Sequence, residues 1–249
     1  MSEKSFVFRR EGFFVRQPLT KRKQDKRRKK MTTQIRQYAL IIVAAMSLLL
    51  AGVAAAERLD ESLSEIESRW ATATYETAGR QKGQELRELL DDARNLHTLY
   101  PDRPEAAAWH GIIARSYMDI KGSMSLAREA RDALLDAESI DPLALDGQVY
   151  AELGALYSNV SSKLGGFGSK TRGIGYFWKA LTVDPDGIDT NYLYAEAMVS
   201  EKNYAAARDA LLRAKESPAR LDHPKADHAC QQKATILLSQ VERKIEELS

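Results

Sequence analysis

The chain has 249 residues and a formal net charge of +2, enough length for one large domain or two small ones. The charge is uneven: residues 1–56 hold 13 Lys and Arg against 3 Asp and Glu, which leaves 24 basic and 32 acidic residues, a charge of −8, in the body. A net-acidic body lacks the basic face that binds phosphates, so no nucleic-acid partner is expected. The single cysteine, Cys230, excludes an internal disulfide.

An uncharged apolar segment at residues 38–56 follows Arg36 and a cluster of Lys and Arg at 21–30, and it ends in three alanines. A positive region, an apolar core and an A-x-A ending predict a secretory signal peptide. The alternative is an uncleaved membrane anchor, because the segment is nearly long enough to span a bilayer. Both interpretations keep the positive side inside and export the body. We therefore expect a basic extension and signal peptide at 1–56 and a helical domain at 57–249.

Two residues refine this prediction. Met31 would open a signal peptide of ordinary length, which makes it a candidate for the true start of the chain. Residues 50–52 resemble the start of a bacterial lipoprotein signal, but Val53 stands where the lipidated cysteine would be. Lipidation at this site is therefore not expected.

The body reads as a series of helices with apolar residues at three- and four-residue spacing. Gly79 and Gly83 are expected to interrupt the first pair, and proline or glycine is expected to end most of the others. No alternating strand pattern occurs in the body. The expected helices are residues 59–77, 85–99, 104–121, 126–140, a segment beginning at 148, a segment beginning at 176, 188–201, 204–215 and 222–248.

Prolines divide these helices into repeating units. Pro101, Pro142, Pro185 and Pro218 are separated by 41, 43 and 33 residues, near the 34-residue period of helix–turn–helix repeats. The last unit, YAEAMVSEKNYAAARDALLRAKESP, resembles the tetratricopeptide family. This resemblance implies an all-α fold, an α-solenoid of tetratricopeptide-like helix pairs, with the final helix as its cap.

A narrower resemblance rests on YAELGALY, a glycine-rich insertion, and FWKALTVDPDGIDTNYLYAE. These motifs resemble the T-component family of TRAP-type periplasmic transporters over most of residues 104–218. The resemblance implies a periplasmic tetratricopeptide-like subunit that associates with a solute-binding receptor. Many members are lipoproteins, and Val53 departs from that pattern.

The insertion at residues 164–175 contains five glycines together with Phe167, Lys170 and Arg172. Ser169 stands where a phosphate-binding loop needs glycine before its lysine, so this chemistry is not expected. Because glycine disfavours fixed structure, we expect a mobile loop with Phe167 exposed. Two interpretations remain open, a lid or docking element over the neighbouring tyrosines and a tolerated surface insertion.

The positions that face the concave groove of tetratricopeptide proteins form an aromatic and polar set without Lys or Arg. A groove of this kind suits an apolar or neutral ligand, or a helix of a protein partner. The alternative is that Tyr117 and Tyr192 only pack against the next repeat. The set is His110, Ala114, Tyr117, Gln148, Ala151, Ser158, Asp189, Tyr192 and Glu196.

Catalytic and metal-binding patterns are weak. His223, Asp227 and Cys230 share a helical face, but no fourth ligand accompanies them, and Asp222 with Pro224 reads better as a helix start. We therefore expect no metal, no cofactor and no catalysis. The predicted function is an exported, periplasmic or secreted, helical-repeat scaffold for protein partners, for example an accessory subunit of a solute-uptake system that contacts the receptor. The alternative is a small-molecule-binding module that takes an apolar ligand, with the glycine-rich loop as its lid.

Overall fold

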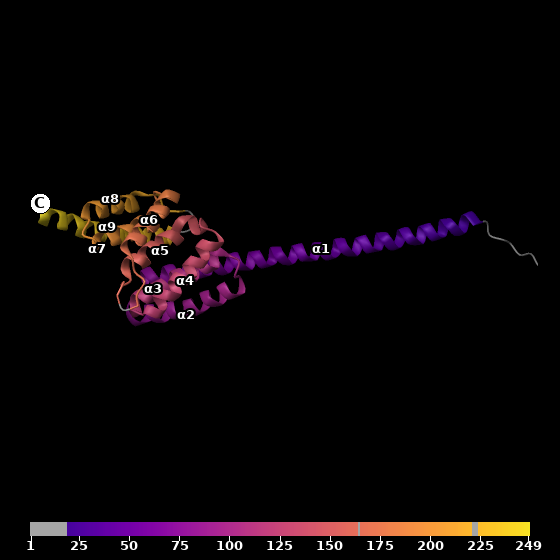
Figure 1. Cartoon of the computed structure of the whole chain (residues 1–249), viewed down its shortest axis with the longest axis horizontal. Coiled ribbons are helices and arrows are strands. Elements are labelled where there is room, and N and C mark those ends of the chain that lie inside the picture. Colours follow the sequence, from indigo (N-terminus) through magenta and orange to yellow (C-terminus); the bar gives the residue numbers. More distant parts are fainter. Residues whose placement is uncertain (1–18, 164, 221–223) are drawn as a thin grey trace, which may run out of the picture. The chain divides into compact units, whose positions relative to one another are not determined.

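The computed structural model describes residues 19–163, 165–220 and 224–249, without most side chains of residues 19–55 (Figure 1). The chain divides into two units, Met1–Arg58 and Leu59–Ser249, and helix α1 (Leu19–Ala71) contributes residues to both. Most of the predicted signal segment at 38–56 lies outside the described side chains, and so does much of the basic cluster at 21–30. Within the described part, no helix is long and apolar enough to cross a membrane.

The described residues of the second unit form helices joined by turns and loops, with no strand among them, which confirms the all-α prediction. Helix α1 continues directly into one turn of π-helix, η1. The elements after α1 are η1 (Thr72–Glu76), α2 (Gly79–Leu99), α3 (Pro104–Lys121), α4 (Met124–Ile140), the 3₁₀ turn η2 (Ala144–Gly147), α5 (Gln148–Asn159), α6 (Lys170–Val183), α7 (Ile188–Ser200), α8 (Tyr204–Glu216) and α9 (Pro224–Leu248).

Local chemistry accounts for many helix ends. Pro104 occupies the first turn of α3, where its missing N–H costs nothing, and Gly122 ends that helix in the left-handed conformation with φ of 63°. Side-chain oxygens of Ser123, Ser169 and Asn203 accept hydrogen bonds from backbone N–H groups in the first turns of α4, α6 and α8. The predicted ends at Pro104 and Gly122 are therefore confirmed.

Helices α2 and α6 begin earlier than the sequence pattern predicts. Helix α2 begins at Gly79 and continues through Gly83, although these glycines were expected to interrupt the pattern until residue 85. Helix α6 begins at Lys170, six residues before the predicted start at Tyr176, because Ser169 caps it. A glycine inside a helix costs only about 1 kcal/mol. Burial of the apolar faces of α2 and α6 offsets that cost.

Consecutive helices pack as pairs, α3 with α4, α5 with α6 and α7 with α8 (Figure 1). The first helices of neighbouring pairs also touch, α3 with α5 and α5 with α7, and α9 packs on both α7 and α8. Gly154 of α5 lies against the fully buried ring of Phe177 in α6, so these two backbones approach closely. Helices α3, α5, α7 and α9 therefore form a continuous series of contacts within the second unit.

Candidate functional site

A cleft of about 630 Å³ opens over α3, α7 and α9. Its lining combines charged and apolar side chains, and Ile236 contributes a side chain that is 62% exposed. We call it the outer cleft. Its lining residues are Arg115, Asp119, Asn159, Tyr192, Glu196, Val199, Ser200, Lys233, Ile236, Leu237 and Gln240.

A smaller cavity of about 210 Å³, the inner pocket, shares part of this lining. It also draws residues from the end of α1, from η1 and from α2, so segments far apart in the chain meet here. The shared residues are Arg115, Asp119, Tyr192, Glu196 and Lys233. The residues of the inner pocket alone are Trp70, Thr74, Tyr75, Lys82, Ser116, Ile120, Glu152, Asp189 and Leu193.

Arg115 holds two carboxylates at the junction of the outer cleft and the inner pocket. Its Nε and Nη2 donate to the two carboxylate oxygens of Glu152, and its Nη1 donates to Asp119 Oδ2 at 2.9 Å. Glu152 is only 2% exposed. Burial by itself would lower the pKa of Arg115, but the carboxylates of Glu152 and Asp119 raise it overall. Burial raises the pKa of Glu152 overall, and the guanidinium of Arg115 opposes that rise.

Tyr192 and Glu196 stand one turn apart on α7 and line both the outer cleft and the inner pocket. The Tyr192 hydroxyl donates to Glu196 Oε1 at 2.8 Å. Burial, with the charge of Glu196, raises the pKa of Tyr192. The phenol therefore stays neutral and fixes the direction of the Glu196 carboxylate.

Asp189 lies at the start of α7, between the inner pocket and a third cavity of about 220 Å³ that Gln148 lines. Arg220 Nη2 donates to Asp189 Oδ2 at 2.9 Å and also bonds Asp227, which is fully buried. Arg220 thereby connects the chain segment before α9 to α7. Asp189, Tyr192 and Glu196 come together at the inner pocket, whereas Gln148 belongs to the third cavity.

His110 does not reach the outer cleft or the inner pocket. It lies between α2 and α4, with its Nδ1 3.0 Å from His97 Nδ1 and its Nε2 2.9 Å from Glu129 Oε1. Arg94 donates two hydrogen bonds to the Glu129 carboxylate, and Asp136 lies 3.0 Å from His97 Nε2. Burial lowers the pKa of His110, against the opposing effect of Glu129. Helix α3 therefore directs the His110 side chain away from the predicted groove and toward α2 and α4.

Tyr117 and Ser158 also line neither cavity. Tyr117 is partly buried and packs against hydrophobic core residues of the second unit, and Lys121 Nζ lies 5.5 Å from the centroid of its ring. Ser158 adjoins Gly173 across the contact of α5 with α6, where any larger side chain at residue 173 would collide with it. These two predicted groove residues thus serve helix packing.

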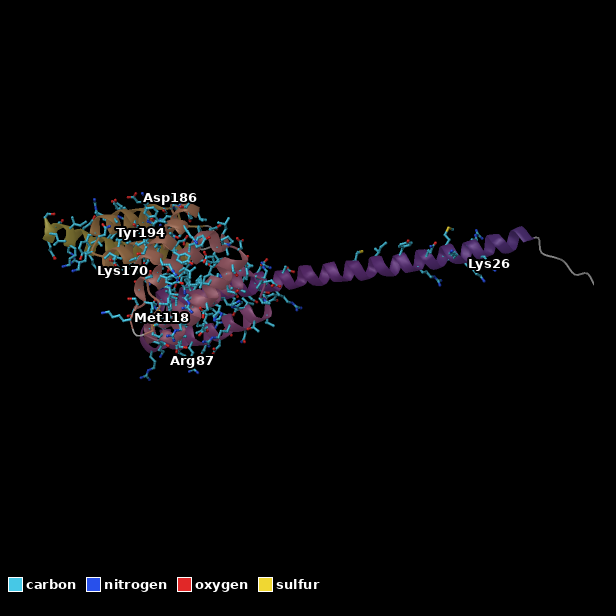
Figure 2. All side chains as sticks on the ribbon, in the orientation of Figure 1. Lys26, Arg87, Met118, Lys170, Asp186 and Tyr194 are labelled. Carbon is cyan, nitrogen blue, oxygen red and sulfur yellow. The ribbon has the colours of Figure 1, made fainter. Side chains whose placement is uncertain are left out.

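The residues of the glycine-rich insertion differ from the prediction. Phe167 is half-buried. Its ring packs edge-on against Tyr157, with 5.5 Å between the two ring centroids, and the Arg131 guanidinium carbon lies 4.6 Å from the centroid of the Phe167 ring. Lys170, labelled in Figure 2, and Arg172 belong to α6. Arg172 stacks on Tyr157 at 4.9 Å. The expectation of an exposed Phe167 is wrong because an aromatic and a cation cover its ring, and none of the three side chains lines the outer cleft or the inner pocket.

Unlike the predicted groove set, the outer cleft and the inner pocket contain Lys and Arg. Arg115 lies one residue beyond the predicted groove position Ala114, and Ala114 is fully buried. Lys82 lies in the stretch that was not expected to be helical, and Lys233 lies in α9, which was expected only to cap the fold. Arg115 and Asp119 stand four residues apart on α3, and this charge pair is a signal that could have identified Arg115. No local pattern connects Lys82 with Lys233.

Cys230 of α9 is a buried small residue, and burial raises the pKa of its thiol well above the ordinary value. Its companion in the metal pattern, His223, lies outside the described residues. Among residues 19–163, 165–220 and 224–249, no group of three His, Cys, Asp or Glu side chains has the arrangement of a metal site.

Neither a protein-family model nor a curated protein sequence matches the chain.

Proposed function

We propose that this chain is an exported α-solenoid binding protein that serves as a scaffold for a protein partner and performs no catalysis. The outer cleft is the observation that carries the proposal. It is open, about 630 Å³ in volume, and it combines exposed Ile236 with charged residues of α3 and α7. Protein interfaces likewise combine apolar side chains with polar and charged ones.

The solenoid arrangement is part of this proposal. Helix pairs that follow one another, with the first helices of successive pairs in contact, are what a tetratricopeptide-like array requires. The resemblance to the T-component family extends the proposal to the partner, which would be a solute-binding receptor of a periplasmic uptake system.

Export to the periplasm or beyond is proposed from the basic cluster, the apolar segment and the alanine ending of residues 1–56. Intact-mass measurement of the protein from its native envelope should give a chain that starts at Glu57. A chain that keeps the segment and fractionates with the membrane would favour the anchor. Cytoplasmic protein with the segment intact would overturn export.

Site-specific photo-cross-linking tests the docking surface. A photoreactive amino acid replaces Ile236 in the outer cleft, and the matched control replaces Leu99, which is 72% exposed at the end of α2. We expect a discrete adduct with a solute receptor from position 236 and none from position 99. Equal labelling from both positions, or no adduct from position 236, would contradict docking in the outer cleft.

The alternative of a small-molecule-binding module gains support from the inner pocket, but not in the form with a glycine-rich lid. Phe167 packs on Tyr157, and neither residue lines the inner pocket. A ligand in this pocket would instead be enclosed by η1, α2 and α9.

A further inference from the structure

Two lysines line the inner pocket from opposite ends of the domain sequence. Lys82 of α2 donates from Nζ to the backbone oxygen of Thr74 at 2.7 Å, and Lys233 of α9 places Nζ 4.5 Å from the centroid of the Tyr75 ring. Both ammonium groups therefore adjoin consecutive residues of η1. Within the described part of the chain, neither has a carboxylate within ion-pair distance.

The carboxylates of the inner pocket are already engaged. Each of the four accepts a hydrogen bond from Arg115, Arg220 or Tyr192. Burial and the charge of Lys233 lower the pKa of Lys82, while Asp119 has the opposite effect. Two like charges in a partly desolvated pocket repel each other, and an anion between them would remove that repulsion.

Thr74 supplies an independent observation. Its Oγ1 is buried and has no hydrogen-bond partner among the described residues. A buried hydroxyl without a partner is uncommon, because it costs roughly 1–3 kcal/mol of desolvation. Thr74 also stands in η1, a π-helical turn, and such turns occur frequently at functional sites.

We propose that the inner pocket binds a small carboxylate, held between the ammonium groups of Lys82 and Lys233 with the Thr74 hydroxyl as a further donor. The body of the ligand packs against aromatic and apolar walls that include Trp70 and Ile120. The engaged carboxylates of the same pocket disfavour a second negative charge on the ligand, so a monocarboxylate is preferred over a phosphate dianion.

This inference goes beyond the scaffold function and does not depend on it. Lys82 and Thr74 line only the inner pocket, whereas Ile236 lines only the outer cleft. Failure of one proposal can therefore be distinguished from failure of the other.

Calorimetric titration of the full chain with benzoate and phenylacetate tests the proposal, with benzamide as the neutral analogue and inorganic phosphate as the alternative anion. We expect saturable binding of at least one carboxylate, at least about tenfold tighter than benzamide or phosphate, and weaker at high salt. Lys82→Met and Lys233→Met should each weaken binding by about tenfold or more. Lys244→Met, an exposed lysine on the same helix as Lys233, should leave it unchanged.

Thr74→Val separates ligand binding from a structural role. It removes the unpartnered hydroxyl at constant shape, so the unliganded protein should keep or gain stability while carboxylate affinity falls. Ile236→Asp should leave carboxylate affinity unchanged, because residue 236 lines only the outer cleft. Benzamide binding as tightly as both carboxylates, the absence of carboxylate binding, or unchanged affinity in folded Lys82→Met and Lys233→Met would overturn the proposal.

Discussion

Gly154→Ala tests the close contact of α5 with α6. An added Cβ at residue 154 would lie 2.9 Å from two atoms of the Phe177 ring and 3.0 Å from a third. Phe177 is fully buried, so its ring can move only by displacing other core side chains. Such overpacking typically costs about 1–3 kcal/mol.

The matched control is Gly175→Ala, at an exposed position of α6 where an added Cβ meets nothing within 4 Å. Both substitutions gain the same helix propensity, about 1 kcal/mol. The control should therefore become more stable by about that amount. The difference between the two variants isolates the cost of the contact, expected at about 1–3 kcal/mol.

Urea unfolding followed by circular dichroism measures both free energies of unfolding, provided that the m-value stays constant. In thermal unfolding, each kcal/mol should correspond to roughly 2–4 °C for a domain of this size. If Gly154→Ala gains as much stability as Gly175→Ala, the Phe177 ring moves aside without cost, and the close packing of α5 on α6 does not stabilise the fold.

Three further predictions concern buried charge, pH and the insertion. Glu152→Ala leaves Arg115 without its buried partner and should lower the free energy of unfolding by about 3–5 kcal/mol in urea titrations; a loss below about 1 kcal/mol would contradict a buried ion pair. Burial lowers the pKa of His110 from 6.5, so below that pH the unfolded chain binds more protons than the folded chain. The contribution of neutral His110 to stability is therefore fully present above pH 6.5 and is lost as the solution is acidified. His110→Gln should therefore make the melting temperature depend less on pH between pH 7.5 and 5.5, by about the contribution of one histidine. Phe167→Ala should lower the free energy of unfolding by about 1–2 kcal/mol, because the Phe167 ring packs on an aromatic ring and a cation. An unchanged melting temperature would instead indicate that the insertion is only a tolerated surface loop.

The sequence by itself determined the helical class and many helix ends. Apolar residues at three- and four-residue spacing leave one face that must be buried, and this local property is independent of the partner helix. Pro104 and Gly122 act within a single turn of chain, so their effects on α3 were predictable. Ser169 acts just as locally, so its cap on α6 was equally predictable. That cap places Gly173 and Gly175 in a helix rather than in a loop.

Only the tertiary structure decided which side chains meet in the inner pocket. Rotation of α3 by one residue turns Arg115 toward the outer cleft and buries Ala114, and that rotation depends on packing between helices. Thr74 and Lys233 are far apart in the chain, so no periodicity relates them. They come together because α9, which packs on α7 and α8, also lies beside η1, and no short motif encodes that arrangement.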